Sequence, residues 1–231
     1  VTILDVTITG GVTAVDGAGI FSRENLRVER SEIVGNESGE EGGGIASFIG
    51  SLTVVDSTIS DNVAANWGGG IYVFSDSKSV VSTLSNSTVS GNEAGNRGGG
   101  INVFIGTLLI EYSAIPDGEA PVDEGSGVAS WADTNIALVQ VRSSIIAGNV
   151  NTDVDLFPGT FPTTFHSLGY NLIGTGDAAQ CFIATGDQKM VANPMLAPLA
   201  DNGGPTGNPA VGPGRPATET GEPSAGRRLG A

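Results

Sequence analysis

The fold is decided by a stretch that occurs twice in the middle of the chain. Residues 58–74 read TISDNVAANWGGGIYVF, and residues 88–104 read TVSGNEAGNRGGGINVF. Each stretch has a β-branched residue three positions before an Asn, and then three Gly followed by Ile. A motif that returns after roughly 20 to 50 residues is typical of solenoids and other repeat proteins.

The same two motifs extend outward from this pair in both directions. The Gly-x-Gly motif ends at Ile20, Ile45, Ile71, Ile101 and Val128, at intervals of 25, 26, 30 and 27 residues. The Asn motif recurs at Asn36, Asn62, Asn92 and Asn149. The spacing therefore predicts about six coils of roughly 27 residues.

Columns of like residues appear when the coils are aligned on the Asn motif. Apolar residues lie three, eight and usually ten positions before it, and the fifth position holds Ser31, Ser57, Ser87, Ser113 and Ser144. Apolar residues two apart indicate β-strands, and Gly, Asn, Ser and Asp in the gaps indicate turns. We therefore predict an all-β, right-handed parallel β-helix with about three short strands per coil. We expect its Asn and Ser side chains to stack in hydrogen-bonded ladders.

The repeats occupy residues 1–150. We expect residues 151–206 to close the same domain and the Pro- and Gly-rich residues 207–231 to have little regular structure. No capping segment precedes the first strand, so the first coil is expected to expose a sheet edge. Such an edge favours end-to-end association with a second copy, or continuation into a longer native protein.

The chain has 25 acidic and 10 basic residues, a formal charge of −15. This disfavours nucleic acid and anionic membranes as partners, because both require a basic surface. A single Cys181 and a single His166 favour neither a disulfide nor a zinc site. No segment approaches the roughly 18 apolar residues of a membrane span. We expect no metal or cofactor, and Ca²⁺ is the alternative that an acidic chain leaves open.

The alternation of Gly-Gly-Gly-Ile with Ile-x-x-Asn resembles the repeats of bacterial polymorphic outer-membrane proteins. Residues 168–174 (LGYNLIG) and 193–206 (NPMLAPLADNGGPT) resemble the end of choice-of-anchor Q β-helix domains. The resemblance covers residues 1 to about 206. It implies a right-handed β-helix, export and attachment to the cell surface, usually without a defined activity. The chain departs from that pattern after Thr206, where a family member continues with a Pro-Gly-Ser-Pro-Ala-Ile-Asp-like stretch.

Two rows of side chains are candidate binding residues. Directly before the glycines of successive coils stand Glu41, Trp67, Arg97 and Glu124. Stacking at strand spacing predicts a cation–π pair between Trp67 and Arg97, or an ion pair between Arg97 and Glu124. The second row is aromatic, with Tyr72 beside it, and contains Phe48, Phe74, Phe104 and Trp131.

Strict alternation from the inward Ile or Val places the aromatic row on the outside of the coil. A contiguous exposed aromatic stripe marks a binding surface. The alternatives are rings that turn inward or are covered by the C-terminal segment, and a charged row that is only an ordinary protein surface.

A third row is acidic and lies in the turn between the Asn and Gly motifs. It contains Glu37, Glu40, Glu41, Glu93, Asp117, Glu119, Asp123 and Glu124. Calcium binding needs several oxygen atoms at one site. The alternative is an acidic rim that faces water.

Candidates for catalysis are few. His166 is the only histidine, and no Gly-x-Ser-x-Gly motif is present. Asp56 shares a row with Asp5 and Arg30, which we interpret as a surface ion-pair ladder rather than an acid/base pair. We therefore expect an extracellular or surface module that binds a polysaccharide, a surface glycan or a partner protein. The alternative is a polysaccharide lyase or glycoside hydrolase, and more remotely an ester hydrolase.

Overall fold

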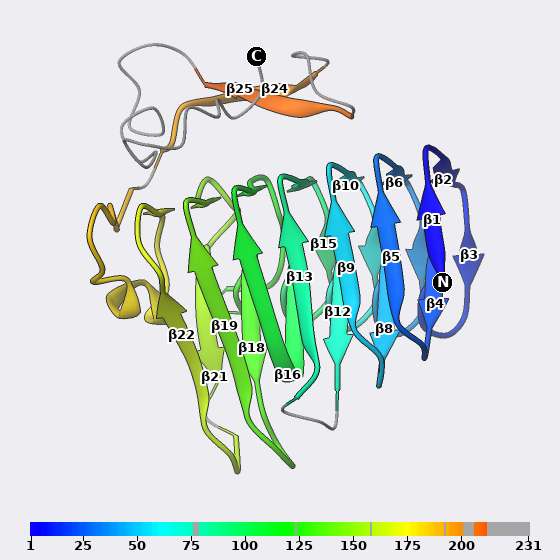
Figure 1. Cartoon of the computed structure of the whole chain (residues 1–231), viewed down its shortest axis with the longest axis horizontal. Coiled ribbons are helices and arrows are strands. Elements are labelled where there is room, and N and C mark those ends of the chain that lie inside the picture. Colours follow the sequence, from blue (N-terminus) through cyan, green and yellow to red (C-terminus); the bar gives the residue numbers. More distant parts are fainter. Residues whose placement is uncertain (76–78, 123, 158, 192, 201–205, 212–231) are drawn as a thin grey trace.

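A computed structural model describes residues 1–75, 79–122, 124–157, 159–191, 193–200 and 206–211. The chain forms an all-β parallel solenoid of about six turns, about 26 residues apart (Figure 1). Of the described residues, only Asp177–Cys181 form a helix, the 3-10 helix η1. The predicted fold class is therefore confirmed.

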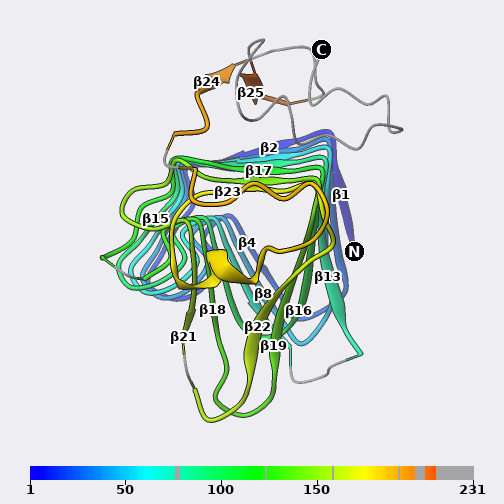
Figure 2. The ribbon, with the colours of Figure 1, turned by 90° about the vertical axis from the view of Figure 1, so that its left-hand side faces the viewer.

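Successive coils add strands to parallel sheets, which enclose the core when viewed along the solenoid (Figure 2). Sheet A contains β1 (Thr2–Leu4), β5 (Leu26–Glu29), β9 (Leu52–Val55), β13 (Val81–Ser85), the second half of β16 (Ile101–Glu111), β19 (Ala137–Arg142) and β22 (Thr163–Ser167). Sheet B contains β2 (Thr7–Thr9), β6 (Glu32–Val34), β10 (Thr58–Ser60), β14 (Thr88–Ser90), β17 (Ala114–Ile115), β20 (Ile145–Ile146) and β23 (Leu172–Ile173).

Sheet C is a row of two-residue strands that the sequence motifs did not predict. It contains β3 (Val12–Thr13), β7 (Glu37–Ser38), β11 (Val63–Ala64) and β15 (Glu93–Ala94). Sheet D follows the glycines and contains β4 (Ile20–Ser22), β8 (Ile45–Phe48), β12 (Ile71–Phe74), the first half of β16, β18 (Val128–Trp131) and β21 (Val154–Phe157). Sheets A and D are joined through β16, which runs from one into the other.

The core consists of the apolar columns that the repeat predicted. In sheet D, Ile45 is in register with Ile71, and Ile71 with Ile101, and all three side chains are buried. The corresponding column of sheet A places Val28 beside Val54. Each fully buried Val or Ile side chain stabilises the fold by about 1.5–3 kcal/mol.

The polar ladders inside the turns are also confirmed. Nδ2 of Asn36 donates to Oδ1 of Asn62, and Nδ2 of Asn62 donates to Oδ1 of Asn92, both at 2.9 Å. In the Ser column, each backbone N–H from Ser31 onward donates to the Oγ one coil later at 3.1–3.2 Å, ending on Ser144. Stacking therefore supplies partners to polar groups that the coil buries.

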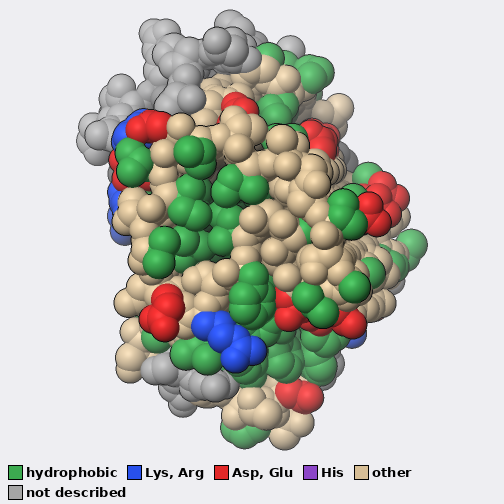
Figure 3. Space-filling view, turned by 90° about the vertical axis from the view of Figure 1, so that its right-hand side faces the viewer, with side chains coloured by type: hydrophobic (Ala, Val, Ile, Leu, Met, Phe, Trp, Pro, Cys, Tyr) green, Lys and Arg blue, Asp and Glu red, His purple; other side chains and the backbone are tan. Residues whose placement is uncertain are grey.

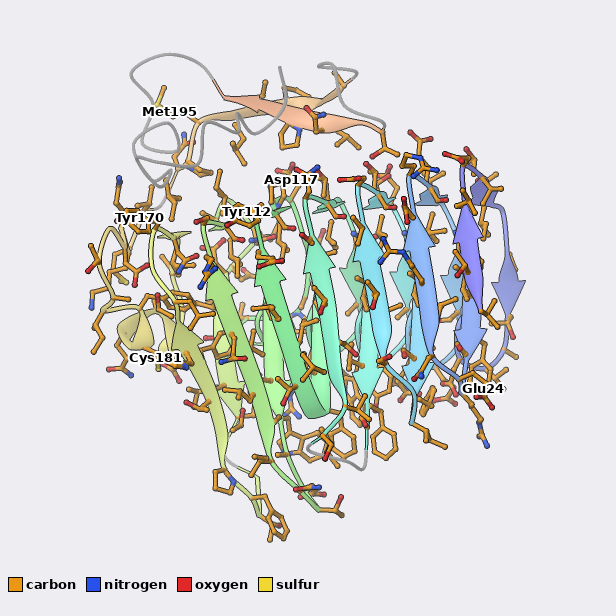
Figure 4. The ribbon with its side chains drawn as sticks, viewed as in Figure 1. Glu24, Tyr112, Asp117, Tyr170, Cys181 and Met195 are labelled. Carbon is orange, nitrogen blue, oxygen red and sulfur yellow. The ribbon has the colours of Figure 1, made fainter. Side chains whose placement is uncertain are left out.

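The parallel pairing continues beyond residue 150, because β21, β22 and β23 each add a strand to the sheet of the previous coil. The helix η1 then packs across the end of the solenoid, where Phe182 lies 6.2 Å from Phe165 between ring centroids. Cys181 lies at this end (Figure 4). The final coil is thus covered by its own following segment.

The strands β24 (Leu196–Ala200) and β25 (Asn208–Val211) form an antiparallel hairpin over sheet B (Figures 1 and 2). Oγ1 of Thr58 on β10 donates to Oγ1 of Thr206 at 2.8 Å. β25 lies within the tail that was expected to lack regular structure, whereas residues 212–231 lie outside the described residues. The hairpin leaves sheet D uncovered by the described part of the C-terminal segment.

The first coil exposes the edge of each sheet, as expected, since β1, β2, β3 and β4 are terminal strands. Figure 3 shows apolar side chains gathered at this end. Exposed large apolar residues of the first coil are Val1, Leu4, Val6, Val12, Val15 and Phe21. Among the described residues, no helix has the length and apolar character needed to cross a membrane.

Candidate functional site

The outer face of sheet D carries two columns of side chains, which we call the aromatic face. The register of the strands defines the first column, which contains Phe21, Ala46, Tyr72, Asn102, Ala129 and Asp155. The second column contains Phe48, Phe74, Phe104, Trp131 and Phe157. Alternation from the buried Ile45 column turns both columns outward.

The rings of the aromatic face form one contiguous series. Centroid distances are 5.4 Å from Phe21 to Phe48, 5.8 Å from Phe48 to Phe74 and 5.7 Å from Phe74 to Phe104. The series ends with 4.8 Å from Phe104 to Trp131. The predicted outward placement is correct, and the rings of the second column are half-buried because they pack on one another.

A row of residues borders this face on the side of the glycine turns, and we call it the border row. It contains Asp16, Glu41, Trp67, Arg97 and Glu124. Each precedes a Gly with positive φ, such as Gly42 at 65°. A Cβ on Gly42 would lie 2.5 Å from the carbonyl oxygen of Ile45, so the turn that places the border row beside the sheet requires glycine.

Trp67 lies across the aromatic face instead of projecting from it. Its ring is stacked on Tyr72 at 6.3 Å and on Phe104 at 6.0 Å, and meets Trp131 edge-on at 5.5 Å. Tyr72 is buried beneath these neighbours. Burial raises the pKa of Tyr72, and the nearby carboxyl groups of Glu41 and Asp16 raise it further.

Arg97 forms the predicted ion pair, with Nε 2.6 Å from Oε2 of Glu124. The predicted cation–π pair with Trp67 is wrong, although the two backbones are bridged. The guanidinium carbon lies 4.2 Å from the ring centroid of Phe157 and 5.2 Å from that of Trp131. Arg97 does not reach Trp67 because its side chain extends toward the following coils, whereas Trp67 belongs to the preceding coil.

At the other end of the border row, Glu41 meets Asp16. The backbone N–H of Glu41 donates to Oδ1 of Asp16 at 3.2 Å. Burial raises the pKa of Glu41 to about 8, with further contributions from contact with the Asp16 carboxyl and from the charge of Glu40. No described Lys or Arg forms an ion pair with either carboxyl group.

The remaining acidic row faces water. Glu37, Glu93 and Glu119 are exposed, and Asp123 lies outside the described residues. Exposed Glu40 accepts a hydrogen bond from Nδ2 of Asn66 at 2.7 Å. The described residues contain no group of three or more His, Cys, Asp or Glu side chains placed to hold a metal ion.

The two weak candidates for catalysis, His166 and Asp56, do not lie close together. His166 is exposed on β22 and Asp56 follows β9, with β13, β16 and β19 between them in sheet A. Nε of Arg30 lies 2.8 Å from Oδ1 of Asp5, as the ion-pair interpretation expected. Asp56 does not extend this ladder, because its Oδ1 accepts a hydrogen bond from Nδ2 of Asn86 at 2.5 Å.

Three residues of the site were not predicted from the sequence. Asp16 precedes Gly17-Ala18-Gly19 and therefore occupies the same position in its coil as Glu41. Alignment of the coils on the glycines could have placed it in the border row. Phe157 lies three residues after Val154, in a coil that lacks the glycine motif. Asn102, in register with Tyr72 and Ala129, was given no binding role.

The fold and this face define a parallel β-solenoid repeat protein with an aromatic outer surface. No family model, curated protein or solved structure matches the chain.

Proposed function

We propose that the chain is an extracellular or cell-surface β-helix module that binds a polysaccharide or surface glycan on its aromatic face. The observation that carries the proposal is the unbroken series of half-exposed rings from Phe21 to Trp131. The resemblance of its repeats to those of bacterial surface β-helix proteins supports the location. Attachment to a surface through further segments is part of the same proposal.

Aromatic rings and sugars are complementary in two respects. A pyranose ring presents an apolar C–H face that packs on an aromatic ring, while its hydroxyl groups need hydrogen-bond partners at the edge. The border row supplies such partners in Glu41, Arg97 and Glu124 beside the rings. Because equivalent residues repeat at the strand spacing of about 4.8 Å, the face suits an extended polymer better than a compact ligand.

Charge narrows the class of glycan. The chain has a net charge of −15, and the border row contains three acidic residues, Asp16, Glu41 and Glu124, against the single base Arg97. Arg97 is already engaged with Glu124. An acidic polysaccharide would be repelled, so the charge favours a neutral or cationic glycan over an anionic one.

The same residues do not favour an enzyme. Glycoside hydrolases need two carboxyl groups separated by about 5–9.5 Å, with the substrate between them. Asp16 instead accepts a hydrogen bond from the backbone N–H of Glu41, and its carboxyl group raises the pKa of Glu41. Asp155, the only carboxylate of the two columns, accepts hydrogen bonds from the N–H groups of Gly125 and Asp177 at 2.9 and 2.8 Å. The Asp155 carboxylate therefore has a structural role, because it holds the backbone at the C-terminal end of the solenoid. Lyase, glycosidase and esterase activities remain outcomes of the test.

The test is incubation of the whole chain with a panel of polysaccharides, read for retention and for new reducing ends or absorbance near 235 nm. We expect retention without product, and loss of retention in Phe74→Ala and Trp131→Ala. A matched control is Tyr112→Asn, which removes a ring at the corner after β16 (Figure 4). Asn suits the Tyr112 backbone (φ 51°) and occupies the equivalent corner at Asn86. Turnover that survives both aromatic changes would overturn the proposal.

A further inference from the structure

Asn102 stands out on the aromatic face because it is polar and buried. It occupies the middle of the first column, in register with Tyr72 on one side and Ala129 on the other. Its side chain is 1% exposed, and its Oδ1 has no hydrogen-bond partner among the described residues. No other described side chain of the aromatic face or border row has a buried polar atom without a hydrogen-bond partner.

The fold does not require a polar residue at this position. The same column holds Ala46 and Ala129, both fully buried, in neighbouring coils. A buried acceptor without a partner lowers the stability of the folded chain. The contrast with Asn62 is direct, since the Asn62 side chain is equally buried but both donates and accepts hydrogen bonds within its ladder.

The Trp67 ring packs on aromatic residues that neighbour Asn102 in the sheet. Asn102 is in register with Tyr72 one coil earlier and with Ala129 one coil later, while Phe104 and Trp131 each follow two residues further along their strands. The Trp67 ring contacts Tyr72, Phe104 and Trp131, with centroid distances of 6.3, 6.0 and 5.5 Å. A ligand that approaches Oδ1 of Asn102 from this face would therefore meet a layer of packed rings that includes Trp67.

We infer that Asn102 is the hydrogen-bonding anchor of the glycan site, and that the Trp67 ring moves aside to admit a neutral sugar whose hydroxyl or amide N–H donates to Oδ1. This rests on the proposed function and deepens it. In the free protein the Trp67 ring is packed on Tyr72, Phe104 and Trp131, and the acceptor is buried and unpaired. In the bound protein a sugar donor satisfies it, and the displaced indole is available to pack against the ligand.

The inference makes an unusual prediction, because removal of the anchor should strengthen the fold and weaken binding. Asn102→Leu keeps the number and branching of the side-chain heavy atoms without a polar atom, and Asn102→Ala reproduces the residue found in neighbouring coils. We expect both variants to raise the melting temperature of the whole chain. We expect affinity for the oligosaccharide that the wild type binds to fall about five- to tenfold, the effect of one lost hydrogen bond.

The probes are cellohexaose, mannohexaose and N-acetylchitohexaose, titrated by calorimetry against wild type, Asn102→Leu, Asn102→Ala and Trp131→Ala. Trp131→Ala reports on the face as a whole. Lost affinity in Trp131→Ala with unchanged affinity in both Asn102 variants would overturn the anchor and leave the proposed function standing. A lower melting temperature in both Asn102 variants would also overturn the anchor. Failure of the wild type to bind any probe would overturn the proposed function and the anchor with it.

Discussion

Glu41 lies directly against Asp16, which occupies the same slot of the border row one coil earlier. The backbone N–H of Glu41 is bonded to Oδ1 of Asp16 at 3.2 Å, and the N–H of Gly17 is bonded to the carbonyl oxygen of Glu41 at 2.9 Å. The repeat therefore holds two carboxyl groups together. At the opposite end of the row Glu124 has Arg97 as a counter-ion, whereas Glu41 has none among the described residues.

This contact predicts a pH-dependent stability. Burial, the Asp16 carboxyl group and the charge of Glu40 raise the pKa of Glu41 to about 8 from its ordinary 4.5, and Tyr72 is the other titratable group nearby. The folded chain then binds more protons than the unfolded chain between these values, so the free energy of unfolding falls as pH rises from about 4.5 to 8. We expect Glu41→Gln to melt at a higher temperature than wild type at pH 8–9.

The measurement is thermal unfolding by circular dichroism between pH 5 and 9. The difference in melting temperature between Glu41→Gln and wild type should grow across this range. Glu37→Gln, at an exposed position on β7, is the control and should follow the wild type. Parallel curves for wild type and Glu41→Gln would show that Glu41 is ionised throughout.

The Asn ladder provides the structural counterpart to Asn102. Nδ2 of Asn62 donates to Oδ1 of Asn92 and to the carbonyl oxygen of Ile33, and its Oδ1 accepts from Asn36. Asn62→Leu leaves these partners unsatisfied in the core, so the free energy of unfolding should fall by about 2–4 kcal/mol. The exposed Asn96→Ala should change it by less than about 0.5 kcal/mol.

Urea denaturation of these variants and of Asn102→Leu compares the same Asn-to-Leu change at two buried sites. The Asn62 side chain is fully hydrogen-bonded, whereas Oδ1 of Asn102 has no partner. We expect a loss of stability at residue 62 and a gain at residue 102. A loss of similar size at both positions would mean that Asn102 is a ladder-like structural residue, against the anchor.

Much of the solenoid could be predicted from the sequence because every coil must place apolar residues in the core and turn residues at its corners. Ile45 and Ile71 must both face the core, and once the coils are aligned, the residues before the glycines must also fall into a row. The ion pair between Arg97 and Glu124 follows from that register alone. The fold and the placement of the aromatic rings are thus consequences of periodicity.

Other features depend on side-chain direction or on segments outside the period. The nearer of the two rings beside the Arg97 guanidinium is Phe157, in a coil without a Gly-x-Gly motif, so no alignment on the glycines placed that ring. The turn of Trp67 onto Tyr72 is a choice of rotamer, which residue spacing does not determine. Among the described residues, β24 and β25 pair with each other and with no strand of the solenoid, and they carry no repeat signal.

The glycine turn that places the border row should be sensitive to any side chain. Gly42 and Gly35 have nearly the same backbone conformation, with φ of 65° and 64°. A Cβ at Gly42 would lie 2.5 Å from the Ile45 carbonyl oxygen, whereas at Gly35 the nearest atom, Oγ1 of Thr9, is 3.7 Å away. We expect Gly35→Ala to cost about 1–2 kcal/mol from its left-handed backbone alone, and Gly42→Ala to cost clearly more. Equal losses in urea denaturation would mean that the turn relaxes without strain.

Arg97 allows ionic and aromatic contributions to be separated at one side chain. Its guanidinium pairs with Glu124 and lies over Phe157, and the side chains of the ion pair are 25% and 30% exposed. We expect double-mutant cycles of Arg97→Gln with Glu124→Gln and with Phe157→Leu to give coupling energies of about 0.5–1 kcal/mol each.

Salt distinguishes the two couplings. In 1 M NaCl the Debye length falls to about 3 Å, so the coupling of Arg97 to Glu124 should shrink, because both groups are reached by solvent. The coupling to Phe157 should persist, since it includes close packing of a planar cation on a ring as well as charge. If both couplings vanish together in urea denaturation at 1 M NaCl, the ring contact depends on the ion pair. In that case the C-terminal part of the aromatic face is ordered by charge, and glycan retention by wild type should weaken at the same salt concentration.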